Sequence, residues 1–206
     1  MPRPIQLSKQ LLKKLPEALD QVQQASPEAT VDLWAFDEHR IGLKPILRRV
    51  WTFNGQRPTA VVEHRYQWLY VYAFVHPASG QTHWFLLPTV NVDVFALALQ
   101  HFAQAVGASQ QKQILLVLDR AGWHTSKALA VPEGLHLLFL PPYSPELQPA
   151  EHLWPLSNEP LVNRHFRDLA ELEEVQAQRG VFLQDFPDLI RSHTSFHWWP
   201  HPREKL

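Results

Sequence analysis

The chain contains no cysteine among its 206 residues, and this absence limits the chemistry open to it. Disulfide bonds and thiolate metal sites are excluded, so any metal ion must be held by carboxylates, histidines or water. Because disulfides are typical of secreted proteins, their absence favours a cytoplasmic location.

Long apolar runs are missing as well. Residues 1–20 mix polar, apolar and lysine side chains and lack the apolar stretch of a signal peptide. The best candidate for a membrane span, residues 95–106, is interrupted by Gln100, His101 and Gln104. We therefore expect no membrane partner. With 45% hydrophobic and 19% charged residues, the chain is expected to form one substantial globular domain.

An excess of basic residues is also absent. The formal net charge is −1 with the 12 histidines neutral, whereas proteins that bind nucleic acid are usually basic. Binding to nucleic acid would require one of two arrangements. Either the basic residues gather on one face, or a separate domain carries most of the positive charge.

The first half of the chain is rich in strand patterns. Residues 7–24 have apolar side chains at helical spacing around Pro16 and predict an amphipathic helix. Residues 31–36 alternate well enough for a strand that runs into Asp37. Residues 67–75 and 82–87 are rich in aromatic and β-branched side chains and flank a turn, so they predict a hairpin.

The second half alternates strands with helices. A helix is expected over residues 92–106, between a capping Asn91 and a terminating Gly107. Five consecutive apolar residues, 114–118, predict a strand buried on both faces, as in a parallel sheet. The remaining expected elements are a short helix from Ser126, a buried strand over 135–140, a helix from Pro149 and a partly helical tail from Leu169.

Antiparallel strands therefore come first and strand–helix units second. This order predicts an α/β fold with a mixed sheet that is flanked by helices. We divide the chain into an N-terminal helical lead-in at 1–30, a main domain at 31–180 and a C-terminal tail at 181–206.

Three carboxylates stand at the ends of predicted elements. Asp37 follows the first strand, Asp119 follows the central buried strand, and Glu151 opens the helix after a proline-rich loop. Functional groups collect at strand ends in open sheets, so we expect the three to share a cleft. Ionised carboxylates repel one another there unless cations are present, and hard oxygen donors select Mg²⁺ or Mn²⁺. Two such ions suit phosphodiester chemistry.

Each carboxylate also has a simpler explanation when it is taken alone. Asp119 can stabilise the turn after a strand, and Glu151 can favour the dipole of a helix first turn. Asp37 can belong to an exposed turn pair with Glu38. Glu38 is itself expected to face solvent, with a carboxylate that supports the metal ligands from behind as the alternative. The order of the three carboxylates and the segments around them decide between these explanations.

Those segments resemble the bacterial insertion-sequence branch of the mariner-like transposases, whose catalytic domain is a DDE endonuclease. The resemblance is carried by FDE at 36–38, LDRAGWHTS at 118–126 and, above all, LPPYSPELQPAEHLW at 140–154. RVW at 49–51 and GQRP at 55–58 match a further family segment.

The resemblance implies a ribonuclease-H-like fold and metal-dependent cleavage of transposon ends, followed by strand transfer into target DNA. By position, Asp37, Asp119 and Glu151 form the catalytic triad and hold two Mg²⁺ or Mn²⁺ ions. The implied partners are double-stranded DNA and a second copy of the chain. The implied place of action is the nucleoid in a bacterial cytoplasm.

The chain departs from the family pattern at several positions. Arg120 stands where the family often has Asn, and Gln148 stands before Pro149 where the family often has Asn. Pro155 and Pro160 would break a helix that is usually longer. None of these departures removes a triad carboxylate.

Only about 30 residues precede the first strand, too few for the helix-turn-helix region that family members usually carry. We therefore expect the domain that recognises the transposon end to lie on a separate subunit, unless the chain is a fragment. An alternative function is a catalytically inert or domesticated module that binds DNA or assembles. A ribonuclease or resolvase on the same fold is a third possibility.

Candidate DNA contacts lie outside the triad. The densest basic stretch and the residues near the second and third acids could contact phosphates. Each candidate also has an alternative explanation. The basic residues could form a solvated surface, the histidine could be hydrogen-bonded in a turn, and the residues before the third acid could only shape the loop. The candidates are Lys44, Arg48, Arg49, Arg57, His124, Tyr143 and Ser144.

A second, weaker basic group consists of Arg164, His165 and Arg167. Trp51 and Trp154 are expected to be core or dimer contacts rather than platforms on which bases stack.

Overall fold

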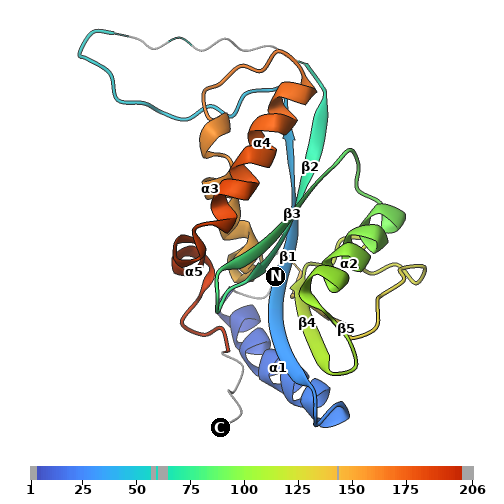
Figure 1. The fold of residues 1–206 in the computed structure, drawn as a ribbon. Helices are drawn as coiled ribbons and strands as arrows, with labels where there is room; N and C mark the ends of the chain where they lie inside the picture. Colours follow the sequence, from blue (N-terminus) through green and yellow to red (C-terminus); the bar gives the residue numbers. More distant parts are fainter. Residues whose placement is uncertain (1–3, 57–58, 60–64, 143, 201–206) are drawn as a thin grey trace.

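A computed structural model describes residues 4–56, 59, 65–142 and 144–200. Within these residues lies one five-stranded sheet with the order β3-β2-β1-β4-β5 (Figure 1). The strands are β1 (Thr30–Gly42), β2 (Trp68–His76), β3 (Gln81–Leu87), β4 (Lys112–Leu118) and β5 (Leu135–Phe139). The first three are antiparallel neighbours, whereas β1, β4 and β5 run parallel. The predicted hairpin and the predicted mixed sheet are confirmed.

β1 is longer than the sequence pattern predicts, and this changes the place of Asp37. The pattern predicted a strand that ends before Asp37, but β1 continues to Gly42. From Ala35 onward β1 pairs with β2, which supplies the hydrogen-bond partners for the extension. Pairing with β4 stops at Ala35 and Val117. Asp37 therefore lies inside a strand, between β2 and the open end of β4.

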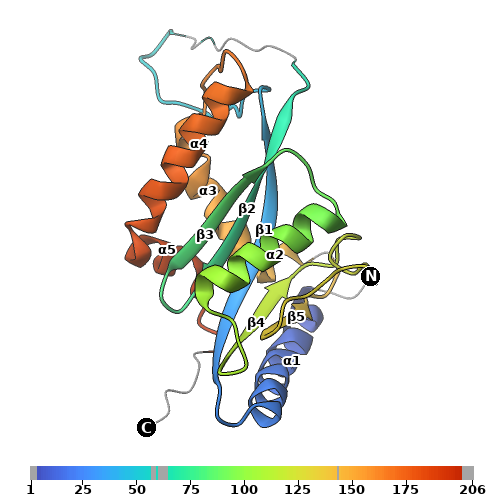
Figure 2. The same cartoon turned by 45° about the vertical axis from the view of Figure 1, so that its right-hand side comes forward.

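One face of the sheet is covered by α2 (Val92–Val106), as both views show (Figures 1 and 2). Asn91 accepts a hydrogen bond from the Val94 N–H at 2.8 Å, and Gly107 ends the helix with a φ of 71°. Both predicted caps are confirmed. Under α2 lies a buried cluster formed by Trp34, Phe36, Phe74, Phe95, Phe102 and Leu116.

Helices α1 (Pro4–Ala25), α4 (Leu169–Gln184) and α5 (Pro187–Thr194) cover the opposite face. Pro16 lies inside α1 without ending it. The side chains buried on this face include Leu15, Leu33, Ala35, Val117, Leu172 and Ile190. Alternate residues of β1 and β4 thus enter opposite clusters. No helix in the part of the chain described here is long and apolar enough to cross a membrane.

The segment after the proline-rich loop consists of short helical pieces, as Pro155 and Pro160 predict. They are the 3-10 turns η1 (Pro145–Leu147), η2 (Pro149–Leu153) and η3 (Glu159–Leu161) and the single α-turn α3 (Trp154–Ser157). Pro149 occupies the first position of η2, where its fixed φ suits a helix start. Glu151 is therefore held by one tight turn and not by a long helix.

Two predictions for the region after β4 are wrong. The expected helix from Ser126 is a turn, closed by a hydrogen bond from the Leu129 N–H to the Ser126 carbonyl at 3.1 Å. Pro132 follows too soon for a helix to form. β5 is an edge strand and pairs only with β4, so its residues beyond Leu135 are partly exposed and not buried.

The C-terminal helix α5 docks on the turn between β2 and β3. A Cβ atom on Gly80 would lie 1.9 Å from the Pro187 carbonyl oxygen, so only glycine fits there. Ile190 and Trp199 belong to the same buried cluster as Leu33. Side chains from beyond residue 180 thus contribute to the core, and the division at residues 30 and 180 stays a prediction.

Candidate active site

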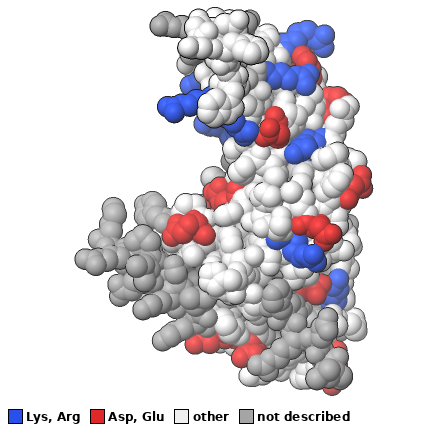
Figure 3. All heavy atoms as spheres, turned by 90° about the vertical axis from the view of Figure 1, so that its left-hand side faces the viewer, with Lys and Arg blue, Asp and Glu red and all other residues white. Residues whose placement is uncertain are grey.

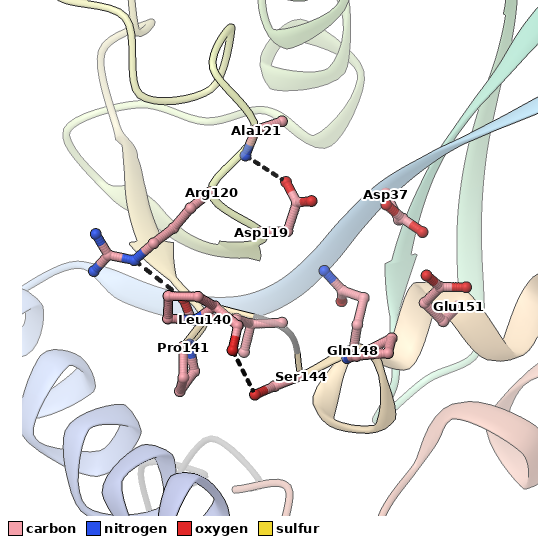
Figure 4. Close-up of a pocket in the computed structure, with 11 residues that line it drawn as sticks. Asp37, Asp119, Arg120, Ala121, Leu140, Pro141, Ser144, Gln148 and Glu151 are labelled. Carbon is pink, nitrogen blue, oxygen red and sulfur yellow. Dashed lines mark hydrogen bonds between the residues drawn. The ribbon is translucent and has the colours of Figure 1, made fainter. Parts of the chain in front are cut away.

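A cavity of about 510 Å³ lies at the end of β4, and all three predicted carboxylates line it (Figure 4). Asp119 follows β4 directly, Asp37 lies in β1, and Glu151 lies in η2. The other lining residues are Arg120, Ala121, Leu140, Pro141, Pro142, Ser144, Pro145 and Gln148. The structure brings the three carboxylates to one cleft, while their catalytic role stays a prediction.

The register of the parallel ladder explains why Asp37 and Asp119 meet. Ala35 pairs with Val117 at the end of that ladder, and Asp37 and Asp119 each lie two residues beyond this last pair, in the same pocket. Since side chains alternate along a strand, both carboxylates emerge on the face where Ala35 and Val117 are buried. Glu151 reaches this face from η2, which packs against β1 and β2.

Two hydrogen bonds fasten the segment that carries Glu151 to β1. The Gln148 Nε2 donates to the Phe36 carbonyl at 2.8 Å, and the Trp154 indole Nε1 donates to Asp37 Oδ2 at 3.0 Å. Trp154 is a core residue, as expected, but its polar edge serves the site. The sequence marked Gln148 only as a departure from the family's Asn before Pro149 and did not predict that its side chain ties η2 to β1.

The electrostatics of the pocket oppose full ionisation of Asp37 and Glu151. Burial, followed by the negative charges of Glu151 and Glu38, raises the pKa of Asp37 well above its usual value, although the Trp154 indole lowers it in part. Burial and the charge of Asp119 raise the pKa of Glu151, against hydrogen bonds that lower it. In the metal-free site both groups therefore keep their protons to a higher pH than a solvent-exposed carboxyl does.

Asp119 is in a different environment. Its Oδ1 accepts hydrogen bonds from the Ala121 N–H at 2.9 Å and from the His124 Nδ1 at 2.7 Å. The bond from His124 is the largest cause of a lowered pKa, so Asp119 stays ionised. Figure 4 shows its other oxygen directed toward the side of the pocket where Asp37 lies.

His124, a predicted DNA contact, is buried. Its side chain is 1% exposed and lies between Asp119 and Glu38, so it has no surface to offer to DNA. The alternative of a hydrogen-bonded histidine in a turn fits the structure. Burial alone would lower its pKa, but the hydrogen bond to Asp119 and the interactions with Glu38 raise it to about 9. Glu38 is not solvent-facing as expected, since its side chain is only 10% exposed.

The other predicted DNA contacts lie at different places. Lys44 and Arg49 are exposed on the loop after β1, away from the residues that line the pocket. Ser144 is buried at the pocket wall and donates to the Pro142 carbonyl at 3.3 Å, so it shapes the loop. Arg57 and Tyr143 lie outside the described residues.

The fold brings the two basic segments of the sequence side by side. The Asn163 side chain accepts from the Arg48 N–H at 2.9 Å and donates to the Arg48 carbonyl at 3.0 Å. Arg65, which sequence reasoning missed, donates to the carbonyls of Phe166 and Arg167. In Figure 3, Lys and Arg side chains gather mainly in the upper part of the face shown, where Figure 1 has the loop after β1 and the start of α4.

The donor set of the pocket fits a hard divalent cation. Among the residues that the structure describes, no three histidine, aspartate or glutamate side chains are gathered closely enough to hold a metal ion. Burial and the neighbouring carboxylates nevertheless raise the pKa values of Asp37 and Glu151. A divalent cation bound to these oxygens would relieve that repulsion.

Residues 32–173 match the protein family described as DDE superfamily endonuclease. The uncharacterized protein y4pE/y4sA of Sinorhizobium fredii (strain NBRC 101917 / NGR234) is 35% identical over 108 residues, which cover 51% of this chain and 77% of that protein. The solved Mos1 mariner paired end complex with Mn has a TM-score of 0.56 at 18% identity, covering 79% of this chain and 53% of that chain. A pre-cleavage Mos1 transpososome has a TM-score of 0.57 at 14% identity, covering 96% and 65%.

The Mos1 structures share the fold with this chain. Their similarity confirms the ribonuclease-H-like mixed sheet with flanking helices. This chain covers 53% and 65% of those two Mos1 chains, so they are considerably longer.

Replacement of Asp37 by Asn should stabilise the metal-free protein. The raised pKa of Asp37 means that its ionisation costs stability as the pH rises from the usual aspartate pKa through the folded-state pKa. Asn keeps the shape and an oxygen that accepts from Trp154. We expect Asp37→Asn to melt higher than the native chain at pH 7, by about 2–4 °C for each kcal/mol gained.

Thermal melts in a chelator between pH 4 and 8 test this, and the difference should shrink toward low pH. Asp32→Asn is the matched control, because Asp32 pairs with Lys112 at 3.1 Å and its loss should not raise the melting temperature. A lower melting temperature for Asp37→Asn at pH 7 would contradict the electrostatic argument.

Proposed function

Since the chain belongs to the DDE superfamily endonuclease family, we propose that it is the catalytic domain of a DNA transposase. In this proposal it cleaves double-stranded DNA at transposon ends and transfers the strands to target DNA. The observation that carries the proposal is the meeting of Asp37, Asp119 and Glu151 in one pocket.

The three carboxylates are the groups that would hold two Mg²⁺ or Mn²⁺ ions. When bound, such ions activate a water or a 3′-hydroxyl and stabilise the leaving oxygen of a phosphodiester. Two of the similar structures are Mos1 paired end complexes, one with Mn and one with Mg, which supports divalent ions here.

The chain's own residues prepare the site in three ways. Gln148 and Trp154 hold η2 against β1 and so set Glu151 at the pocket wall. Burial keeps Asp37 from full solvation, which strengthens its interaction with a cation. Because the pKa values of Asp37 and Glu151 are raised in the metal-free protein, metal loading is expected to lower them and so to favour release of protons.

Nicking of supercoiled plasmid in the presence of Mn²⁺ tests the proposal. A catalytic metal supplies several kcal/mol, so Asp119→Asn should lower the nicking rate by about a hundredfold or more. Asp32→Asn, a carboxylate on the same sheet outside the pocket, should leave the rate unchanged.

Equal rates for the native chain and Asp119→Asn would refute the assignment of the pocket. We also propose that a separate helix-turn-helix subunit supplies recognition of the transposon ends. If the folded native chain fails to nick DNA even with such a subunit, the chain is instead assigned as a catalytically inert module of the same fold.

We assign phosphate contacts to the joined basic segments, represented by Lys44, Arg49 and Arg167. Their exposure and their proximity across the loop after β1 and the start of α4 support this role. With the near-neutral net charge, this surface corresponds to the first of the two arrangements considered above, basic residues gathered on one face.

The salt dependence of binding to a short DNA duplex checks this surface. Each lost phosphate contact should reduce the slope of log affinity against log salt by about 0.9. We expect this reduction for Arg49→Ala but not for Arg191→Ala, because Arg191 pairs with Asp188 on α5 at 2.8 Å. Identical slopes for the two variants would exclude Arg49 from the interface.

We propose that two copies of the chain form a homodimer through the loop after β1. Trp51 is 104% exposed and Phe53 is 82% exposed. Trp51 is therefore not a core residue, which leaves the dimer contact as its expected role. Exposed aromatic side chains of this kind are typical of contact surfaces. The Mos1 complexes hold paired ends, which supports a two-copy assembly here.

Sedimentation velocity, with and without DNA, measures the assembly. Trp51→Ser combined with Phe53→Ser should convert the dimer to a monomer, whereas Phe182→Ser on α4, also an exposed aromatic, should not. A double variant that still dimerises would show that another surface is used.

A further inference from the structure

A chain of buried polar contacts runs behind the pocket and ends on Asp119. The Trp123 indole Nε1 donates to Glu38 Oε1 at 2.8 Å. Glu38 Oε2 lies 3.2 Å from the His124 Nε2, an ion-pair contact whose geometry is not that of a hydrogen bond. The His124 Nδ1 then contacts Asp119 Oδ1 at 2.7 Å.

Trp123, Glu38 and His124 lie on the opposite face of the sheet from Asp37. Glu38 follows Asp37 in β1, so its side chain points toward the cluster under α2. The His124 ring packs against Phe95 at 4.4 Å and Phe36 at 5.6 Å between ring centres. Packing on the ring and contacts at both nitrogens thus restrain the imidazole.

Asp119 by itself is poorly restrained. Its side chain is 56% exposed and follows the last residue of β4, where neighbouring strands no longer confine it. Two donors, His124 and the Ala121 N–H, meet on the same oxygen, Oδ1. They turn the other oxygen toward the part of the pocket where Asp37 lies (Figure 4).

We propose that Glu38 and His124 are positioning residues, which set the Asp119 carboxylate for metal binding from the far side of the sheet. This inference rests on the proposed function, in which Asp119 is a metal ligand. Groups that orient a metal ligand in this way commonly change metal affinity by a factor of roughly 10–100. Trp123 completes the set by holding Glu38.

A purely structural role is the alternative. In that case the three residues only tie the turn after β4 to β1, and their loss would affect stability alone. The two roles differ in Mn²⁺ affinity, which is measurable without DNA and without turnover.

Calorimetric titration of Mn²⁺ into the metal-free full chain decides between them. His124→Leu fits the apolar surroundings of Phe36 and Phe95 but removes the donor to Asp119. We expect it to weaken Mn²⁺ binding by roughly 10–100-fold. His124→Asn, which can still donate to Asp119, should recover part of the loss. His76→Leu is the matched control, because His76 is partly buried and contacts Ser79 at 2.7 Å outside the pocket, and it should bind Mn²⁺ as the native chain does.

A double variant, Glu38→Met with His124→Leu, covers the case in which His124→Leu leaves an uncompensated charge on Glu38 and unfolds. It removes both charges of the pair and should bind Mn²⁺ as weakly as His124→Leu. Native affinity in either folded variant would overturn the positioning role.

Failure of the proposed function gives a different result. The native chain and Asp119→Asn are titrated first, and equal or absent Mn²⁺ binding in both would refute the metal site itself, and the positioning role with it. Binding that is lost in Asp119→Asn but unchanged in His124→Leu would refute only the positioning role.

Discussion

The site depends on the point where β4 ends while β1 continues. Parallel pairing stops at Ala35 and Val117, but the hairpin keeps β1 extended to Gly42. Asp37 is therefore held rigidly by a strand that has lost one neighbour, and Asp119 follows the strand that stopped. The pocket occupies the space beyond β4, and η2 closes it from the side through the bonds of Gln148 and Trp154.

This arrangement carries an electrostatic cost that the rest of the fold must offset. Asp37 and Glu151 sit where burial and like charges disfavour their ionised forms. Clusters of apolar side chains on both faces of the sheet supply the opposing stability. On the far face, Glu38 and His124 form an ion pair that is largely buried. Stability and the proposed chemistry thus make opposite demands on the same few residues.

The sequence predicted the fold where local patterns and tertiary context agree. The hairpin, the caps at Asn91 and Gly107 and the apolar strand before Asp119 all carry signals within a few residues of each other. Two of the wrong predictions lie where partners distant in sequence decide. The extension of β1 past Asp37 needs β2, and the exposure of β5 follows from its place at the sheet edge.

The sequence by itself determined the class of fold and the family, and it predicted the three carboxylates that line the pocket, because periodicity and short motifs are properties of neighbouring residues. It did not determine that His124 is buried, that Glu38 pairs with it, or that Arg48 meets Asn163. Those contacts join residues from separate elements, and each amino-acid type there is equally compatible with solvent. Only the strand register and the docking of η2 on the sheet selected the contacts that form.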